Sequence, residues 1–146
     1  MTGTENDEKK YFKSLLLLIG KNKIISDDEK ALLLDTCDIL GFNRDLCKDK
    51  IEHVYDDNYI IDEAPRFSNP TIAKILLKDG IRIALADKSP HIYEIYWLRS
   101  IAKKNHIPDD WLAGEIYLFL NSYDSGNSYD LEIQKYLARK HNLLNS

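Results

Sequence analysis

Residues 26–41 read SDDEKALLLDTCDILG, and this stretch has the signals of a complete amphipathic helix. Ser26 and Glu29 form a capping-box pattern, in which the hydroxyl and the carboxylate each satisfy a backbone N–H at the start of a helix. Apolar side chains then recur at steps of three and four, as in a helix that buries one face. Gly41 is a natural stop, because glycine readily adopts the left-handed conformation that ends many helices. The stretch therefore predicts a helix over 27–41.

The same signals recur along the chain. Cap residues stand before prolines at Asn69-Pro70 and Ser89-Pro90, Asn43 is a weaker cap, and acidic residues follow Pro108. Apolar residues recur at steps of three and four after these starts, for example at Ile116, Leu118 or Phe119, and Leu120. Asn105 is a second natural stop. No hairpin pattern joins two extended runs. We expect an all-α fold of about seven helices, over about 8–21, 27–41, 44–56, 70–87, 90–105, 109–122 and 130–141.

Length and composition are those of one globular domain spanning residues 1–146. The chain has 20 Lys and Arg against 24 Asp and Glu, a formal net charge of −4, whereas a dedicated nucleic-acid binder normally has a basic surface and a high pI. The longest apolar run, Leu15 to Ile19, is far shorter than the roughly 20 residues that cross a bilayer. Residues 1–10 do not form a secretory signal. We expect a cytoplasmic protein with no nucleic-acid partner and no transmembrane segment.

The sequence contains an internal repeat, which is seen when the chain is aligned with itself at a shift of 65 positions. Glu29 then meets Glu94, and polarity and expected helix starts agree along both copies. This predicts two pseudo-symmetric three-helix units, about 8–56 and 73–122, followed by a C-terminal helix. Each unit alone has too little core, so we expect the two to pack face to face. Chance similarity between helical segments is the alternative explanation.

The turns of this repeat resemble those of TerB-like domains, which are associated with tellurite resistance. The better copy is residues 83–94, IALADKSPHIYE, and the first copy is residues 22–29, NKIISDDE. Units of that family have an apolar helix, an Ala-Asp-Gly turn and a Glu that opens the next helix. Here Lys23 and Lys88 stand in place of the turn glycine. The resemblance covers about residues 11–112 and implies an all-helical, non-enzymatic adaptor in stress-response or membrane-associated complexes.

The resemblance also implies a divalent cation at the acidic turns. Asp87, Glu94 and Glu29 carry the family's acids, and Asp27 or Asp28 would join them if both turns faced one cleft. Hard cations take several oxygen ligands, of which carboxylates also supply charge. The structural alternative is that Glu29 completes the capping box, Asp27 and Asp28 favour a helix start, and Asp87 ends a helix.

Aromatic residues suggest a second, metal-free function. Tyr93 and Tyr96 fall on one predicted helix, where helical spacing is typical of a core. They could instead rim an interaction surface, since aromatic residues are favoured there. The alternative hypothesis is therefore a metal-free protein–protein interaction module. A protein partner is expected under both hypotheses, and peripheral membrane association and the oligomeric state stay open.

Catalytic patterns are missing from the sequence, so we expect that the protein is not an enzyme. Cys37 lies on an apolar helix face and is assigned to the core. Cys47 and His53 fall on nearly opposite sides of one helix, so they do not form a nucleophile–base pair without tertiary help. Two cysteines do not make a disulfide framework. No metalloprotease, redox or phosphate-loop motif occurs.

Overall fold

The computed structural model describes residues 3–20, 25–54, 63–85, 92–121 and 131–145. These residues form seven α-helices and no strand, which confirms the predicted all-α fold. The helices are α1 (Gly3–Gly20), α2 (Asp27–Leu40), α3 (Arg44–Glu52), α4 (Pro70–Leu85), α5 (Ile92–Lys104), α6 (Asp109–Leu120) and α7 (Glu132–Asn145). Within the described ranges, no helix is both long enough and apolar enough to cross a membrane.

Local capping chemistry sets the ends of α2 and the start of α3. The Ser26 side chain accepts a hydrogen bond from the Glu29 amide at 3.1 Å, and the Glu29 carboxylate accepts one from the Ser26 amide at 3.0 Å. Gly41 follows α2 with a φ of 80°. Asn43 then accepts from the Leu46 amide at 3.1 Å and caps α3. The predicted capping box, glycine stop and weaker cap are confirmed.

α5 ends at Lys104, next to the predicted stop at Asn105. The left-handed residue, however, is His106, with a φ of 57°. The His106 amide donates to the carbonyl of Lys103, and the Ile107 amide donates to that of Ala102. This is the paired hydrogen bonding that closes a helix when one residue turns left-handed. Asn105 instead binds a distant segment through its side chain, as described below.

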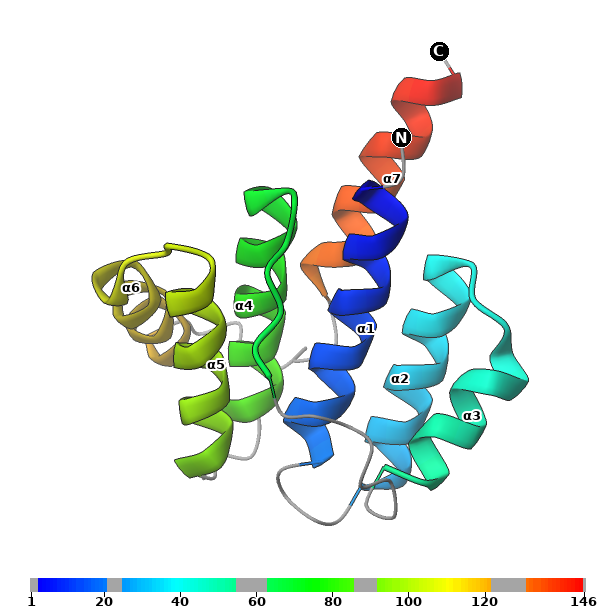
Figure 1. The fold of residues 1–146 in the computed structure, drawn as a ribbon, viewed down its shortest axis with the longest axis horizontal. Coiled ribbons are helices and arrows are strands. Elements are labelled where there is room, and N and C mark those ends of the chain that lie inside the picture. Colours follow the sequence, from blue (N-terminus) through cyan, green and yellow to red (C-terminus); the bar gives the residue numbers. More distant parts are fainter. Residues whose placement is uncertain (1–2, 21–24, 55–62, 86–91, 122–130, 146) are drawn as a thin grey trace.

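The helices are arranged around α1 and α4 (Figure 1). α1 lies between α2 and α4, and α3 packs on α2. On the other side, α5, α6 and α7 all contact α4. The first three helices thus lie on one side of the α1–α4 contact, and α5 and α6 lie on the other. Descent of the two groups from a duplicated unit stays a prediction.

The apolar run at residues 15–19 is wholly buried because α1 has neighbours on both sides. Leu15, Leu18 and Ile19 are all at most 1% exposed. Trp97 on α5 packs into the same core, and its indole N–H donates to the Ser14 carbonyl on α1 at 3.0 Å. Because this part of α1 is buried around its circumference, it needs no amphipathic stripe, which explains the continuous apolar run.

The apolar stripe expected on α6 is only partly correct. Leu112 is buried, and Ile116 and Phe119 are half-buried. Leu120 was expected on this stripe, with either Leu118 or Phe119, but Leu120 is 64% and Leu118 is 62% exposed. Because α6 lies at the outer edge of the bundle and contacts α4 and α5, it has more apolar side chains than covered surface.

Candidate functional site

The acidic residues predicted to bind a cation lie in different surroundings. Glu29 is engaged in the capping box, and Asp27 and Asp28 are exposed in the first turn of α2. Glu94 is buried on α5 and only 2% exposed. Asp87 lies outside the described residues. Among the side chains that the structure does describe, no three His, Cys, Asp or Glu residues form a metal-binding group.

The two tyrosines predicted at an interaction surface are both exposed. Tyr93 is 56% and Tyr96 is 55% exposed on α5. The nearby Trp97 is buried, so this helix has an aromatic residue on each face. Exposure fits a rim role for the two tyrosines, and partner binding by them stays a prediction.

A groove between α1 and α3 is a candidate binding site. Its volume is about 710 Å³, within the range of roughly 300–1,000 Å³ that is usual for ligand sites. The turn between α2 and α3 forms part of its wall. Its lining is an apolar floor with lysines at the edges, contributed by Lys9, Phe12, Lys13, Leu16, Gly41, Phe42, Asn43, Leu46, Cys47 and Lys50.

One face of α1 forms one side of the groove. Lys9, Phe12, Lys13 and Leu16 follow steps of three and four, so they share one face of the helix. The left-handed turn after α2 then brings Phe42 against α1, where its ring meets that of Phe12 edge to face at 6.1 Å between centroids. Such edge-to-face pairs are favoured by the ring quadrupoles. The aromatic pair therefore fixes the floor of the groove.

A disulfide bond between Cys37 and Cys47 forms part of the groove wall. It joins α2 to α3, with 6.6 Å between the two Cα atoms, and both cysteines are buried. Cys37 lies in the core as predicted, but its bond to Cys47 was not predicted. The pairing depends on the tight α2–α3 turn, which brings together two residues ten positions apart.

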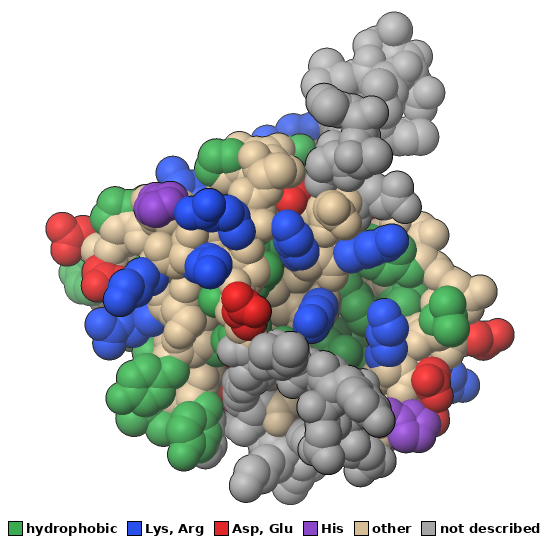
Figure 2. All heavy atoms as spheres, viewed as in Figure 1, with side chains coloured by type: hydrophobic (Ala, Val, Ile, Leu, Met, Phe, Trp, Pro, Cys, Tyr) green, Lys and Arg blue, Asp and Glu red, His purple; other side chains and the backbone are tan. Residues whose placement is uncertain are grey.

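The electrostatics of the groove differ from those of the whole chain. The chain has a net charge of −4, yet none of the described residues that line the groove is acidic. Lys9 and Lys13 lie on the α1 side and Lys50 lies on the α3 side. Figure 2 shows Lys and Arg side chains gathered on this face, with hydrophobic atoms exposed between them. The groove thus combines an apolar floor with positive charge on two sides.

Two buried aspartates have structural roles that the sequence analysis did not identify. Asp7 on α1 is 0% exposed and binds the segment before α4. Its carboxylate accepts from the Ser68 amide at 2.9 Å, the Ser68 hydroxyl at 2.8 Å and the Asn69 amide at 3.0 Å. A buried carboxylate is tolerated when its oxygens are hydrogen-bonded in this way. Asp7 therefore positions the start of α4.

Asp79 on α4 positions the start of α7. Its carboxylate accepts from the Glu132 amide at 2.6 Å, the Ile133 amide at 3.1 Å and the Tyr11 hydroxyl at 2.7 Å. Burial raises the pKa of Asp79 to about 6, although these hydrogen bonds and Arg82 act to lower it. The sequence did contain a signal for this role. Asp79 stands within the apolar sequence ILLKDGIRIAL, and a charge on a buried helix face requires hydrogen-bond partners.

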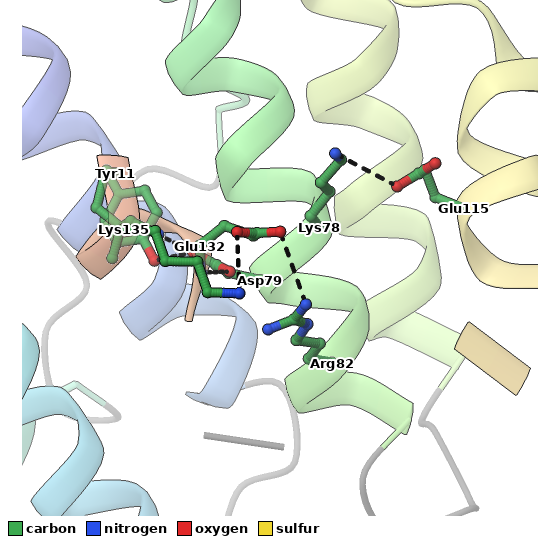
Figure 3. A network of polar contacts seen from close by, with 8 residues as sticks. Tyr11, Lys78, Asp79, Arg82, Glu115, Glu132 and Lys135 are labelled. Atoms are coloured by element: carbon green, nitrogen blue, oxygen red, sulfur yellow. Dashed lines mark hydrogen bonds and ion pairs between the residues drawn. The ribbon is translucent and has the colours of Figure 1, made fainter. Parts of the chain in front are cut away.

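Charged side chains surround the Asp79 site at the surface (Figure 3). Glu132 lies 3.7 Å from Arg82 and 3.8 Å from Lys135, measured between the charged atoms. Lys78 lies 3.9 Å from Glu115 on α6. Since the hydrogen bonds of Asp79 join α1, α4 and α7, this cluster has a structural role.

Comparison with known proteins yields no similarity on which to base a function. No family model matches the chain, and neither a curated protein nor a solved structure matches it.

Proposed function

We propose that this protein is a non-enzymatic binding module whose groove between α1 and α3 holds an acidic amphipathic helix of a partner protein. The observation that supports this proposal is the combination of an apolar floor with lysines from both sides and no acidic residue in the described lining. Amphipathic helices commonly lay their apolar face into such grooves. This develops the metal-free interaction hypothesis.

Charge complementarity defines the occupant. Apolar residues of the partner at steps of three and four would contact Phe12, Leu16 and Leu46, and acidic residues flanking them would meet Lys13 and Lys50. Leu46 is 63% exposed although it lies beside buried residues, so an occupant would cover an apolar side chain that is now in water. Lysines at the edge mainly speed association and select an acidic partner.

The test uses a labelled model helix with leucines on one face and glutamates beside them. We expect this peptide to bind, and a peptide with lysines in place of the glutamates to bind at least about tenfold more weakly, a difference of about 1.4 kcal/mol. The groove variants Leu46→Asp and Lys13→Glu should each weaken the acidic peptide. Lys30→Glu, on the exposed surface of α2, is the matched control.

Two results would contradict the proposal. One is equal binding of the acidic and basic peptides. The other is equal loss of binding in Lys30→Glu and Lys13→Glu, because that result would reflect net charge and not the groove. Circular dichroism of each variant should retain the helical spectrum, so that loss of binding is not confused with loss of fold.

Cation binding by the acidic turns remains a separate hypothesis, with Asp87 and Glu94 as its main residues and Glu29, Asp27 and Asp28 beside them. A bound cation would raise the melting temperature by mass action. Melts with Ca²⁺, Mg²⁺, Mn²⁺ or Zn²⁺, each with and without EDTA, test this. A shift that persists in the double variant Asp87→Ala/Glu94→Ala, or the absence of any shift, would reject these residues as ligands.

Membership of the TerB-like family and a cytoplasmic location also remain proposals. The turn motifs support the first. The second must be reconciled with the disulfide, because such bonds form and persist mainly in oxidising compartments. Thiol labelling of the protein in its native cells measures the redox state of Cys37 and Cys47. Full labelling of both cysteines would favour a reducing compartment, and their protection would argue against one.

A further inference from the structure

A second pocket lies where α5 ends and α6 begins. Its volume is about 660 Å³, and it shares no lining residue with the groove. Its described lining combines cationic side chains with a tyrosine and a proline: Tyr96, Arg99, Ser100, Lys103, His106, Ile107, Pro108 and Asp109. The pocket is thus chemically unlike the leucine- and phenylalanine-lined groove.

Positive charge dominates this second pocket. Arg99 and Lys103 are four residues apart on α5, so they project from one face of the helix. Asp109 is the one acid among the described residues that line the pocket. It lies 3.9 Å from Arg99, and both side chains are more than half exposed. Exposed ion pairs of this kind contribute little, so an anionic ligand can compete for Arg99.

Arg66 adds a further cation next to this pocket. One of its guanidinium nitrogens lies 3.1 Å from Nε2 of His106. Because a guanidinium only donates, Nε2 is the acceptor in this hydrogen bond, and the ring N–H is then on Nδ1. His106 therefore has an N–H to offer to a second acceptor.

Asn105 holds Arg66 and His106 in position. Its side-chain amide donates to the Pro65 carbonyl at 2.8 Å, and its side-chain oxygen accepts from the Phe67 amide at 2.8 Å. These bonds tie the segment on both sides of Arg66 to the end of α5. The backbone that carries Arg66 and His106 is thus positioned by the fold before any ligand binds, which lowers the entropic cost of binding.

The backbone of His106 supports a functional role for its side chain. Its φ of 57° lies in the left-handed region, where a residue other than glycine is uncommon. Glycine usually occupies this position after a helix. Histidine at this position makes the folded protein less stable than glycine would. The side chain of His106 lines the cationic pocket.

We propose that this pocket binds a phosphate monoester carried by a side chain of a partner protein. Guanidinium and imidazole donors suit the several acceptor oxygens of a phosphate, and charge-assisted hydrogen bonds of this type are strong. The volume exceeds that of a phosphate group, so the attached side chain can lie against Tyr96 and Pro108. The described lining has no long apolar channel for acyl chains, which favours a phosphorylated protein over a lipid.

The probe for this site is N-acetyl-O-phosphoserine amide, followed by amide chemical shifts in a nuclear magnetic resonance titration. We expect saturable shifts at residues 99–109 and none with the unphosphorylated amide. Arg99→Gln and Lys103→Gln should each weaken binding about tenfold. Lys104→Gln is the matched control, because Lys104 is the exposed neighbour that does not line the pocket.

Several outcomes would overturn the proposal. They are shifts that do not saturate, equal loss of affinity in the Lys104→Gln control, and binding to phosphatidic-acid vesicles without binding to the phosphoserine probe. The last outcome would assign the surface to a membrane. Because the two sites share no lining residue, Leu46→Asp should leave phosphoserine binding unchanged, so failure here is distinguishable from failure of the proposed groove function.

Discussion

The hydroxyl of Tyr11 on α1 donates a 2.7 Å hydrogen bond to the carboxylate of Asp79 on α4, and both residues are 0% exposed. The same carboxylate accepts from the first two amides of α7. Burial, followed by the charge of Asp79, raises the pKa of Tyr11 well above its ordinary value. One buried carboxylate therefore links three helices, and the fold depends on its protonation state.

Stability should depend on pH through Asp79. Its pKa in the folded protein is about 6, above the ordinary value of 3.8, so the folded chain binds this proton more tightly than the unfolded chain does. Its contribution is fully present below about pH 4 and is lost as the pH rises through about 6, a total of about 3 kcal/mol. Other carboxylates titrate over part of this range, so the measurement must isolate Asp79.

Comparing the wild type with the Asp79→Asn variant isolates the contribution of Asp79 to stability. We expect the unfolding free energy of the wild type minus that of the variant to fall by about 2 kcal/mol between roughly pH 4 and pH 7. Urea titrations across this range measure both proteins. The exposed Asp35→Asn serves as the control for the loss of one carboxylate at the surface. A flat or rising difference for Asp79→Asn would show that this carboxyl does not have a raised pKa.

Two glycine-to-alanine substitutions should have opposite effects. A Cβ added at Gly80 would lie 2.6 Å from Leu98 and 3.2 Å from Leu18, both in the core, whereas Gly114 has no atom within 4 Å of the added carbon. Overpacking should outweigh the gain in helix propensity and cost Gly80→Ala about 1–2 kcal/mol. Gly114→Ala should gain about 0.5–1 kcal/mol. Thermal melts of both variants test this, and equal shifts would contradict the close packing at Gly80.

Reduction of the disulfide should lower the stability of the protein. Opening a bond that closes a loop of this size costs about 2–3 kcal/mol in the chain-entropy model. We expect the melting temperature to fall on addition of reductant. The double variant Cys37→Ala/Cys47→Ala should not respond to reductant. If both proteins melt at the same temperature with and without reductant, the bond does not stabilise the fold.

Loss of the disulfide should also weaken the groove. Cys47 lines the groove, and the bond holds α3 against α2. The acidic model peptide should therefore bind the reduced protein more weakly, while binding of the phosphoserine probe at the α5–α6 pocket stays unchanged. Parallel loss at both sites would indicate general unfolding and not a local effect on α3.

Replacing His106 with glycine should separate stability from binding. His106→Gly relieves the left-handed backbone and should raise the unfolding free energy by about 0.5–1 kcal/mol. The same variant removes the imidazole and should weaken phosphoserine binding. Asn105→Gly is the contrasting variant, because it removes the hydrogen bonds to Pro65 and Phe67 and should destabilise the protein. Lower stability of His106→Gly would show that the Arg66 contact outweighs the backbone strain.

Helix positions followed from local chemistry. The capping box at Ser26, the left-handed Gly41 and the Asn43 cap act within a few residues, so the pattern of the chain was enough to predict them. The prediction of which residues are buried was less complete. Leu33 and Cys37 are buried as predicted, but Leu118 and Leu120 are exposed, because periodicity shows which face is apolar and not whether a neighbour covers it.

The candidate sites required the assembled fold. The groove combines residues of α1 with others about 30 positions later, Asp79 meets Tyr11 across 68 positions, and Arg66 meets His106 across 40. The net charge could be predicted from the sequence, but the local charge of the groove could not. The counts of basic and acidic residues predict a net charge of −4, whereas the packing of the helices places lysines around an apolar floor. Helical patterns arise from contacts within one or two turns and can be read along the chain. Pairings between distant residues depend on which helix faces pack together, and that depends on the free energy of the whole core.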